Sequence, residues 1–161
     1  MKKMLLLIPL LLVSCGTEPV DPLGYQDQAF SARVTFSGDE EFRAIVSMTP
    51  VANGREFSLT LNDGLLSGVT FYIGENDYLE KDGMRIPIAR QDGIDEMIGM
   101  FDISTDDFYS SEETPDGGVF VYTTDDGAKY EVTIVDSLPK RIIATLDGRT
   151  IIAEIDEFLP G

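Results

Sequence analysis

The sequence predicts a mainly β fold: an antiparallel meander of about nine strands that curves into a half-open barrel and carries a central helical insert. Three observations support this prediction. Apolar and polar residues alternate along nine segments, short turns containing Asp and Gly separate several of them, and one stretch near the middle has helical spacing instead. Because alternation sends successive side chains to opposite faces, each segment is expected to bury one face of a sheet.

Five strands are expected between residues 30 and 88. Residues 30–36 (FSARVTF) alternate strictly, so their apolar side chains share one face of a strand. Lys81-Asp82-Gly83 forms a turn before the fifth segment, and Pro87 lacks a ladder donor, which predicts an edge or a strand end there. The five apolar sets are Phe30, Ala32, Val34 and Phe36; Phe42, Ala44, Val46 and Met48; Phe57, Leu59 and Leu61; Val69, Phe71 and Ile73; and Met84, Ile86 and Ile88.

Two hairpins are expected in the last third of the chain. Residues 119–124 and 128–135 flank Asp125-Asp126-Gly127, and residues 141–146 and 149–155 flank Asp147-Gly148. Glycine tolerates the positive φ that tight hairpin turns require, and Asp-Gly is a preferred two-residue turn. Strands joined by such short turns must be antiparallel neighbours.

A helix is expected between the two groups of strands. Ile94, Met97, Ile98 and Phe101 follow i, i+3, i+4, i+7 spacing, with Asp92 placed as an N-cap. A second short helical turn is expected over residues 106–111, capped by Ser104 or Thr105, and a loop over residues 114–118 then returns the chain to the sheet.

The start of the chain has the pattern of a secretion signal. Residues 1–14 combine Lys2 and Lys3 with an apolar stretch of residues 4–13, directly before Cys15, the single cysteine. Ten residues including Pro9 are too short for a membrane span, which needs about 20 apolar residues. Leu12-Val13-Ser14-Cys15 resembles the bacterial lipobox, which implies cleavage before Cys15 and a diacylglycerol on its thiol. Residues 15–24 are then a lipidated cysteine and tether, and the protein is expected on the extracytoplasmic face of a cell membrane.

The remaining residues, 25–161, are expected to form one domain of ordinary size. Removal of residues 1–14 takes away two of the 12 basic residues and none of the 29 acidic ones, which leaves a formal charge of 10 − 29 = −19. Such a charge repels nucleic acid and anionic head groups, so neither DNA nor RNA is expected as a partner. Only the lipid is expected to hold the protein to its membrane.

The order of elements resembles the LolA/LolB-like group, in which incomplete β-barrels carry or accept lipoproteins and helices lie over an apolar hollow. Ala29-Phe30-Ser31-Ala32 at the first strand and Leu138-Pro139-Lys140-Arg141-Ile142 at the entry to the last hairpin carry this resemblance. It implies an unclosed barrel over about residues 25–158. The family has a sizeable helix before the first strand, whereas residues 25–28 provide a short candidate, and a carrier shuttles whereas this chain is expected to be anchored.

Catalytic chemistry has little support in the sequence. The chain contains no histidine, and lipidation would consume its single thiol, which removes the commonest general base and the best nucleophile. Glu154 and Asp156 share one face of a strand and could in principle act on a glycoside, but a solvated outer face explains them better. We therefore expect a non-enzymatic protein without a cofactor.

A calcium loop is matched only in part. Asp102, Ser104, Asp106 and Glu113 occupy the first, third, fifth and twelfth positions of such a loop, but Asp107 stands where the sharp turn needs glycine. Because an acidic chain produces such matches by chance, no metal site is predicted.

Two functions are consistent with these observations. In the first, the protein binds an apolar ligand, such as an acyl chain or another protein's lipid, between the sheet and the helical insert. Methionine adapts to irregular apolar shapes, and the expected ligand-binding residues are Met97, Met100, Phe101, Phe36 and Phe71. In the second, the same helix completes a solid core, and the domain is a structural or interaction protein with a partner in the cell envelope.

Overall fold

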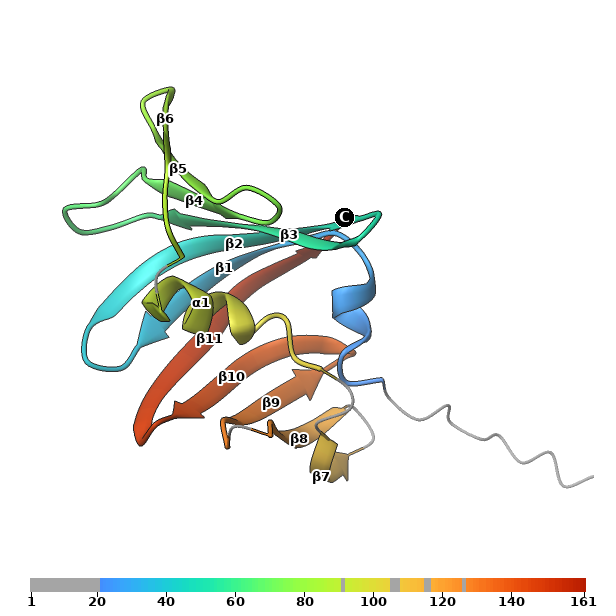
Figure 1. Cartoon of the computed structure of the whole chain (residues 1–161). Coiled ribbons are helices and arrows are strands. Elements are labelled where there is room, and N and C mark those ends of the chain that lie inside the picture. The colour runs from blue at the N-terminus through green and yellow to red at the C-terminus, as the bar shows by residue number, and fades with distance from the viewer. Residues whose placement is uncertain (1–20, 91, 105–107, 115–116, 126) are drawn as a thin grey trace, which may run out of the picture.

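The computed structural model describes residues 21–90, 92–104, 108–114, 117–125 and 127–161, and within them the chain forms one curved antiparallel sheet around a single α-helix (Figure 1). The expected signal peptide, Cys15 and the first part of the tether lie outside these residues. The tether's later residue Leu23 is buried in the core. No helix in the described part of the chain is long and apolar enough to cross a membrane.

The first half of the chain supplies a short 3-10 helix and six strands. These are η1 (Gly24–Asp27), β1 (Phe30–Ser37), β2 (Glu41–Val51), β3 (Gly54–Leu61), β4 (Thr70–Ile73), β5 (Tyr78–Lys81) and β6 (Met84–Pro87). The second half supplies α1 (Asp92–Gly99), β7 (Phe108–Thr114), β8 (Gly117–Thr123), β9 (Lys129–Val135), β10 (Leu138–Leu146) and β11 (Arg149–Pro160).

The strand order is β6-β5-β4-β3-β2-β1-β11-β10-β9-β8-β7, so the sheet is two meanders joined through its first and last strands. The prediction of one continuous meander was therefore wrong at its middle, because β6 and β7 lie at opposite edges. Between them, α1 crosses the inner face of the curve (Figure 1). The edge position predicted from Pro87 is confirmed, since this residue ends the edge strand β6.

Two of the eleven strands were missed. Strand β5 has no fully buried residue and therefore shows no apolar alternation. Strand β7 occupies part of the region predicted as a helical turn over residues 106–111, and this prediction was wrong over residues 108–111, where Ser110 pairs with Val121 and Ser111 with Phe120. Sheet pairing with β8 overrides a weak local helix preference there. Residues 105–107 lie outside the described part of the chain.

The predicted loop over residues 114–118 was wrong at Thr114, which ends β7, and at Gly117 and Gly118, which begin β8. Residues 115–116 lie outside the described part of the chain. Gly117 pairs with Val135 and has φ +150°. A Cβ at this position would lie 2.1 Å from the carbonyl oxygen of Ile134. The glycine that suggested a loop is thus required by close backbone packing inside the ladder.

The inner face of the sheet carries most of the predicted apolar sets. One cross-strand row runs Phe158, Ala32, Val46, Leu59, Phe71, Leu79 and Ile86 from β11 to β6. Ile86, the last residue of this row, is 52% exposed, and Met84 is 64% exposed. The expectation that the fifth apolar set would be buried was therefore wrong for these two residues. The β5–β6 hairpin extends beyond α1, and no other helix or strand of the described chain lies over its inner face (Figure 1).

Two of the predicted turns are confirmed, whereas the third, Asp125-Asp126-Gly127, includes Asp126, which lies outside the described residues. Asp147 and Gly148 have φ values of 48° and 79°, and Asp82 and Gly83 have 51° and 78°. Positive φ at both central residues is the type I′ conformation, whose twist matches that of the flanking strands. The Asp147-Gly148 turn brings β11 back against β10, with Leu146 opposite Arg149.

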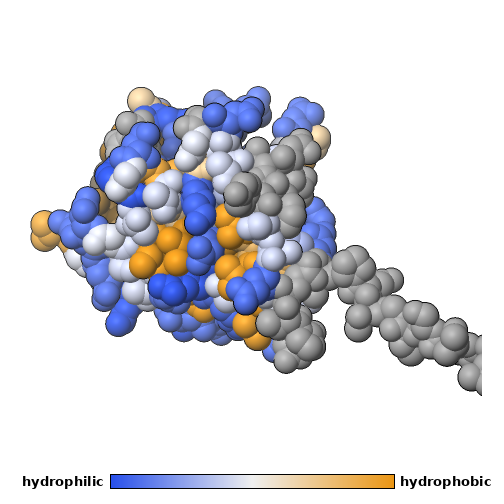
Figure 2. All heavy atoms as spheres, turned by 90° about the horizontal axis from the view of Figure 1, so that it is seen from below, coloured by the Kyte–Doolittle hydropathy of each residue, from blue (hydrophilic) through white to orange (hydrophobic). Residues whose placement is uncertain are grey.

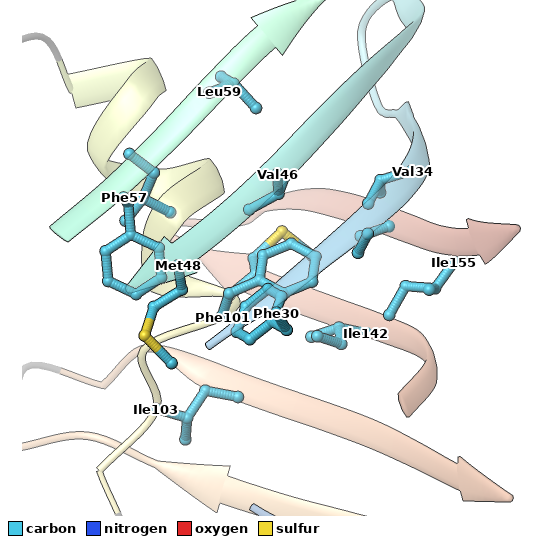
Figure 3. Packing of buried hydrophobic residues seen from close by; sticks show 14 of the residues in the cluster. Phe30, Val34, Val46, Met48, Phe57, Leu59, Phe101, Ile103, Ile142 and Ile155 are labelled. Atoms are coloured by element: carbon cyan, nitrogen blue, oxygen red, sulfur yellow. The ribbon is translucent and has the colours of Figure 1, made fainter. Parts of the chain in front are cut away.

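The core lies between the inner face of the sheet and the part of the chain around α1. We call this part, residues 90 and 92–103, the α1 segment. Phe101 and Phe30 lie together at its centre, surrounded by side chains from several strands, including Val46 and Ile142 (Figure 3). The predicted helix is confirmed, but it ends at Gly99, and Phe101 follows in a turn in which its N–H donates to the Ile98 carbonyl. The face of the molecule seen in Figure 2 is mainly hydrophilic, with small groups of hydrophobic residues near its middle.

Candidate functional site

A groove of about 410 Å³ lies between α1 and the tips of the β1–β2 and β10–β11 hairpins. These tips are at the opposite end of the sheet from the start of β1 and the end of β11, where Phe30 pairs with Pro160. We call this site the distal groove. Its apolar lining consists of Phe36, Phe42, Met97 and Ile151.

A series of aromatic rings connects the distal groove with the core. Phe36 and Phe42 are stacked with ring centroids 5.3 Å apart, and Phe36 meets Phe101 edge to face at 6.5 Å. Phe101 in turn contacts Phe30, with centroids 6.0 Å apart. The apolar surface of the groove is therefore continuous with the buried cluster beneath the α1 segment.

The five predicted ligand-binding residues are not all in one place. Phe36 and Met97 line the distal groove. Met100 and Phe101 have no exposed surface and fill the inside of the curve, where Phe101 contacts Phe36. Phe71 is buried on β4 between Leu59 and Leu79 and does not line the groove. The structure thus combines two of these residues at a surface and two in the core directly behind it.

Three ion pairs fasten the α1 segment to the sheet. Arg90 pairs with Asp77 in the β4–β5 loop at 3.0 Å, Glu96 of α1 pairs with Arg149 at the start of β11, and Asp102 pairs with Arg55 of β3 at 2.6 Å. Arg149 and Glu96 are also part of the lining of the distal groove. Sequence reasoning missed these pairs because partners 13, 47 or 53 residues apart leave no periodic signal.

A small polar cluster lies where the chain enters the fold. Gln26 is 2% exposed, donates to the Tyr25 hydroxyl at 3.3 Å, and accepts from Arg55 at 3.4 Å. Burial is the main cause that raises the pKa of Tyr25 above its ordinary value. This phenol is therefore protonated at neutral pH and acts as a structural hydrogen-bond partner of Gln26.

The two carboxylates considered for catalysis, and one of those considered for calcium binding, have structural partners. Glu154 and Asp156 are both exposed on the outer face, where Glu154 pairs with Arg141 at 2.8 Å and Asp156 accepts from Thr35 at 3.1 Å. Of the partial calcium loop, Asp102 pairs with Arg55, whereas Asp106 lies outside the described residues. Among the residues described, no three Asp, Glu, His or Cys side chains are grouped to hold a metal.

The fold defines a class of protein: an unclosed, strongly curved antiparallel sheet with one helix across its inner face. The sequence matches no family model and no curated protein. Among solved structures, the chain is similar to an uncharacterized conserved protein from Thermus thermophilus, with a TM-score of 0.52, 15% identity, and coverage of 88% of this chain and 84% of that one. At this identity the likeness shows the fold alone.

A second similar structure is that of MucB, with a TM-score of 0.47 and 9% identity. The alignment covers 88% of this chain and 58% of MucB, so this chain corresponds to less than two thirds of MucB. The strand order of this chain, with β6 and β7 at opposite edges, shows the unclosed β-sheet that the LolA/LolB-like resemblance implies.

Proposed function

We propose that this protein is a non-enzymatic binding protein of the bacterial cell envelope, anchored in a membrane by a lipid on Cys15, which holds an acyl chain or another protein's lipid in the distal groove. Kinship with the LolA/LolB-like group is part of this proposal. The distal groove with its ring series from Phe42 through Phe36 to Phe101 is the observation that carries it.

The dimensions and chemistry of the distal groove suit a single acyl chain. Small-molecule sites usually measure about 300–1,000 Å³ and have mainly apolar linings with a few polar groups. The groove measures about 410 Å³, and the apolar side chains Phe36, Phe42, Met97 and Ile151 form its wall. Met97 is half-buried, and its unbranched side chain can change rotamer to admit a chain of variable shape.

The position of the groove suits a ligand delivered from outside the anchoring membrane. The described chain begins at the end of the sheet that holds η1 and the C-terminal strand end, and the distal groove lies at the other end. With a mature charge of −19 the protein surface is repelled by anionic bilayers. The tether on Cys15 therefore holds the domain near a membrane while the groove remains open to the aqueous side.

The test is binding of an uncharged fluorescent monoacylglycerol to residues 16–161, which retain every residue that the structure describes. We expect saturable binding of one probe molecule per chain. Met97→Asp should weaken binding at least tenfold, because it places a carboxylate in the apolar wall. Met84→Asp makes the same change at an exposed site on β6 and should leave affinity unchanged. Equal effects of the two variants would contradict the proposal.

One observation favours a second function. Met100 and Phe101 have no exposed surface, so the inside of the curve is already filled by the protein's own side chains. A domain with such a core can act as a structural or interaction protein of the envelope. Absence of probe binding to the folded wild-type domain would favour this second function.

A further inference from the structure

We propose that a second groove, on the other side of α1, binds an amphiphilic amine: a ligand with an apolar body and a cationic nitrogen. This proximal groove lies between α1, β3, the end of β4 and the β2–β3 turn, and its volume is about 700 Å³. It shares no lining residue with the distal groove, because Asp95, Ile98 and Gly99 of α1 face it whereas Gly93, Glu96 and Met97 face the other. The proposal is thus independent of the acyl-chain site.

The floor of the proximal groove is apolar. Phe57 and Ile73 are cross-strand partners on β3 and β4, and Ile98 of α1 lines the groove with them. All three are at most 6% exposed, so they belong to the core and have fixed positions. Gly74 also lines the groove and packs closely against Glu56, since a Cβ there would lie 2.9 Å from the Glu56 side chain. An apolar ligand body would therefore meet a rigid surface at little conformational cost.

The rim of the groove has an excess of negative charge. Its two cations already have carboxylate partners: Arg55 pairs with Asp102, and Arg90 pairs with Asp77 just outside the groove. Glu56, Glu75 and Asp95 also line the rim, and none forms an ion pair with any residue that the structure describes. Counting Asp77, the charges sum to 2 − 5 = −3.

The apolar floor and the excess of negative charge at the rim together indicate which class of ligand the groove can bind. An anionic amphiphile would place its head among three carboxylates that form no ion pair with the described residues, although Asp95 interacts electrostatically with the already paired Arg90. An ammonium group would supply the charge that the rim lacks. Asp95 is half-buried beside the apolar floor, so a cation bound there is screened less by salt than one at a fully exposed carboxylate. The net charge of the chain adds a general attraction for cations, and the test must separate that attraction from the groove itself.

The experiment compares decylammonium, decanol and decanoate, which share one tail, by calorimetry on residues 16–161 at low ionic strength and below micellar concentrations. We expect decylammonium to bind about tenfold tighter than decanol, with decanoate weakest. In Glu75→Gln/Asp95→Asn the preference over decanol should fall to about twofold. Asp82→Asn/Asp136→Asn is the matched control, since it removes two carboxylates from exposed turns at positive φ that Asn tolerates, and it should keep the preference.

Three results would overturn the proposal. The first is a preference for decylammonium that persists in Glu75→Gln/Asp95→Asn at the level of the control. The second is displacement of the monoacylglycerol probe by decylammonium in a one-to-one manner, which would place both ligands in the distal groove. The third is binding of a basic peptide by the protein without any binding of decylammonium. The first and third results do not depend on whether the distal groove binds an acyl chain, so the proposal can fail while the proposed function stands.

Discussion

Phe36 and Phe101 meet edge to face with ring centroids 6.5 Å apart, although β1 and the end of the helical segment supply them from positions far apart in the chain. Phe36 lines the distal groove, whereas Phe101 has no exposed surface. This contact is therefore the boundary between a surface that a ligand can reach and the core that supports it. It separates the roles of the residues on its two sides.

Shortening a residue on the core side of this boundary should mainly reduce stability, whereas shortening one on the groove side should mainly reduce ligand affinity. Phe101→Ala is expected to lower the free energy of unfolding by about 3–5 kcal/mol, because it removes a large buried side chain. Met97→Ala, at a half-buried position, should cost about 1 kcal/mol yet weaken the monoacylglycerol probe several-fold. Denaturant midpoints and probe affinities, measured on both variants, test this. A larger loss of affinity in Phe101→Ala than in Met97→Ala, with the domain still folded, would contradict the assignment.

The two faces of β9 should differ sharply in their tolerance of charge. Ile134 is 1% exposed on the inner face, so Ile134→Asp buries a carboxylate without a partner and should cost about 3–5 kcal/mol. Thr133 is the adjacent residue on the outer face, opposite Arg141, and Thr133→Asp should change stability by less than about 1 kcal/mol. Urea unfolding of both variants is the measurement. Similar losses would mean that the register of β9 is wrong.

Two glycines that line the distal groove, Gly93 and Gly148, should respond to alanine in opposite directions. Gly148 has φ +79° in the β10–β11 turn, so Gly148→Ala should destabilise by about 1–2 kcal/mol. Gly93 lies in α1 with no neighbouring atom within 4 Å of an added Cβ, so Gly93→Ala should stabilise by about 0.5–1 kcal/mol. Thermal unfolding of the two variants measures both changes in stability. A stabilising Gly148→Ala would contradict the type I′ turn.

Local patterns predicted much of this fold because strand alternation and turn chemistry are local properties. Phe30, Ala32, Val34 and Phe36 were assigned to one face, and all four are buried. Strand β5 was not predicted because it buries no residue fully. Strand β7 was not predicted because it is formed by pairing with β8. The pairing of β1 with β11 was not predicted either, because it joins the first and last strands and no short segment encodes it.

The candidate site was predicted only in part. Helical spacing identified Met97, and strand alternation identified Phe36, and these two residues line one groove. Neither helical spacing, which includes Phe101, nor the adaptability of methionine, which suggested Met100, can distinguish a ligand contact from a core residue, so both residues were grouped with them. The ion pairs of Arg55 and Arg149 and the proximal groove arise from contacts between distant segments, which periodicity does not report.

The proposed anchor predicts a specific change in location. Cys15→Ser should abolish incorporation of a tagged fatty acid and release the protein from membranes or leave it as an unprocessed precursor, because the chain contains no other thiol. Labelling of cells followed by membrane fractionation measures both effects. Equal label in the wild type and the variant would rule out lipidation at Cys15.

The most direct test of the distal groove is NMR of residues 16–161 labelled with ¹³C at the methionine methyl groups, which gives four signals, from Met48, Met84, Met97 and Met100. These residues lie in the core, on an exposed strand, at the groove and behind it, respectively. On addition of the monoacylglycerol, the Met97 methyl should shift and show cross-relaxation with the acyl chain, while the Met84 methyl stays unchanged. Contacts of the chain with Met84 and none with Met97 would place the ligand on the exposed β5–β6 face and contradict the account.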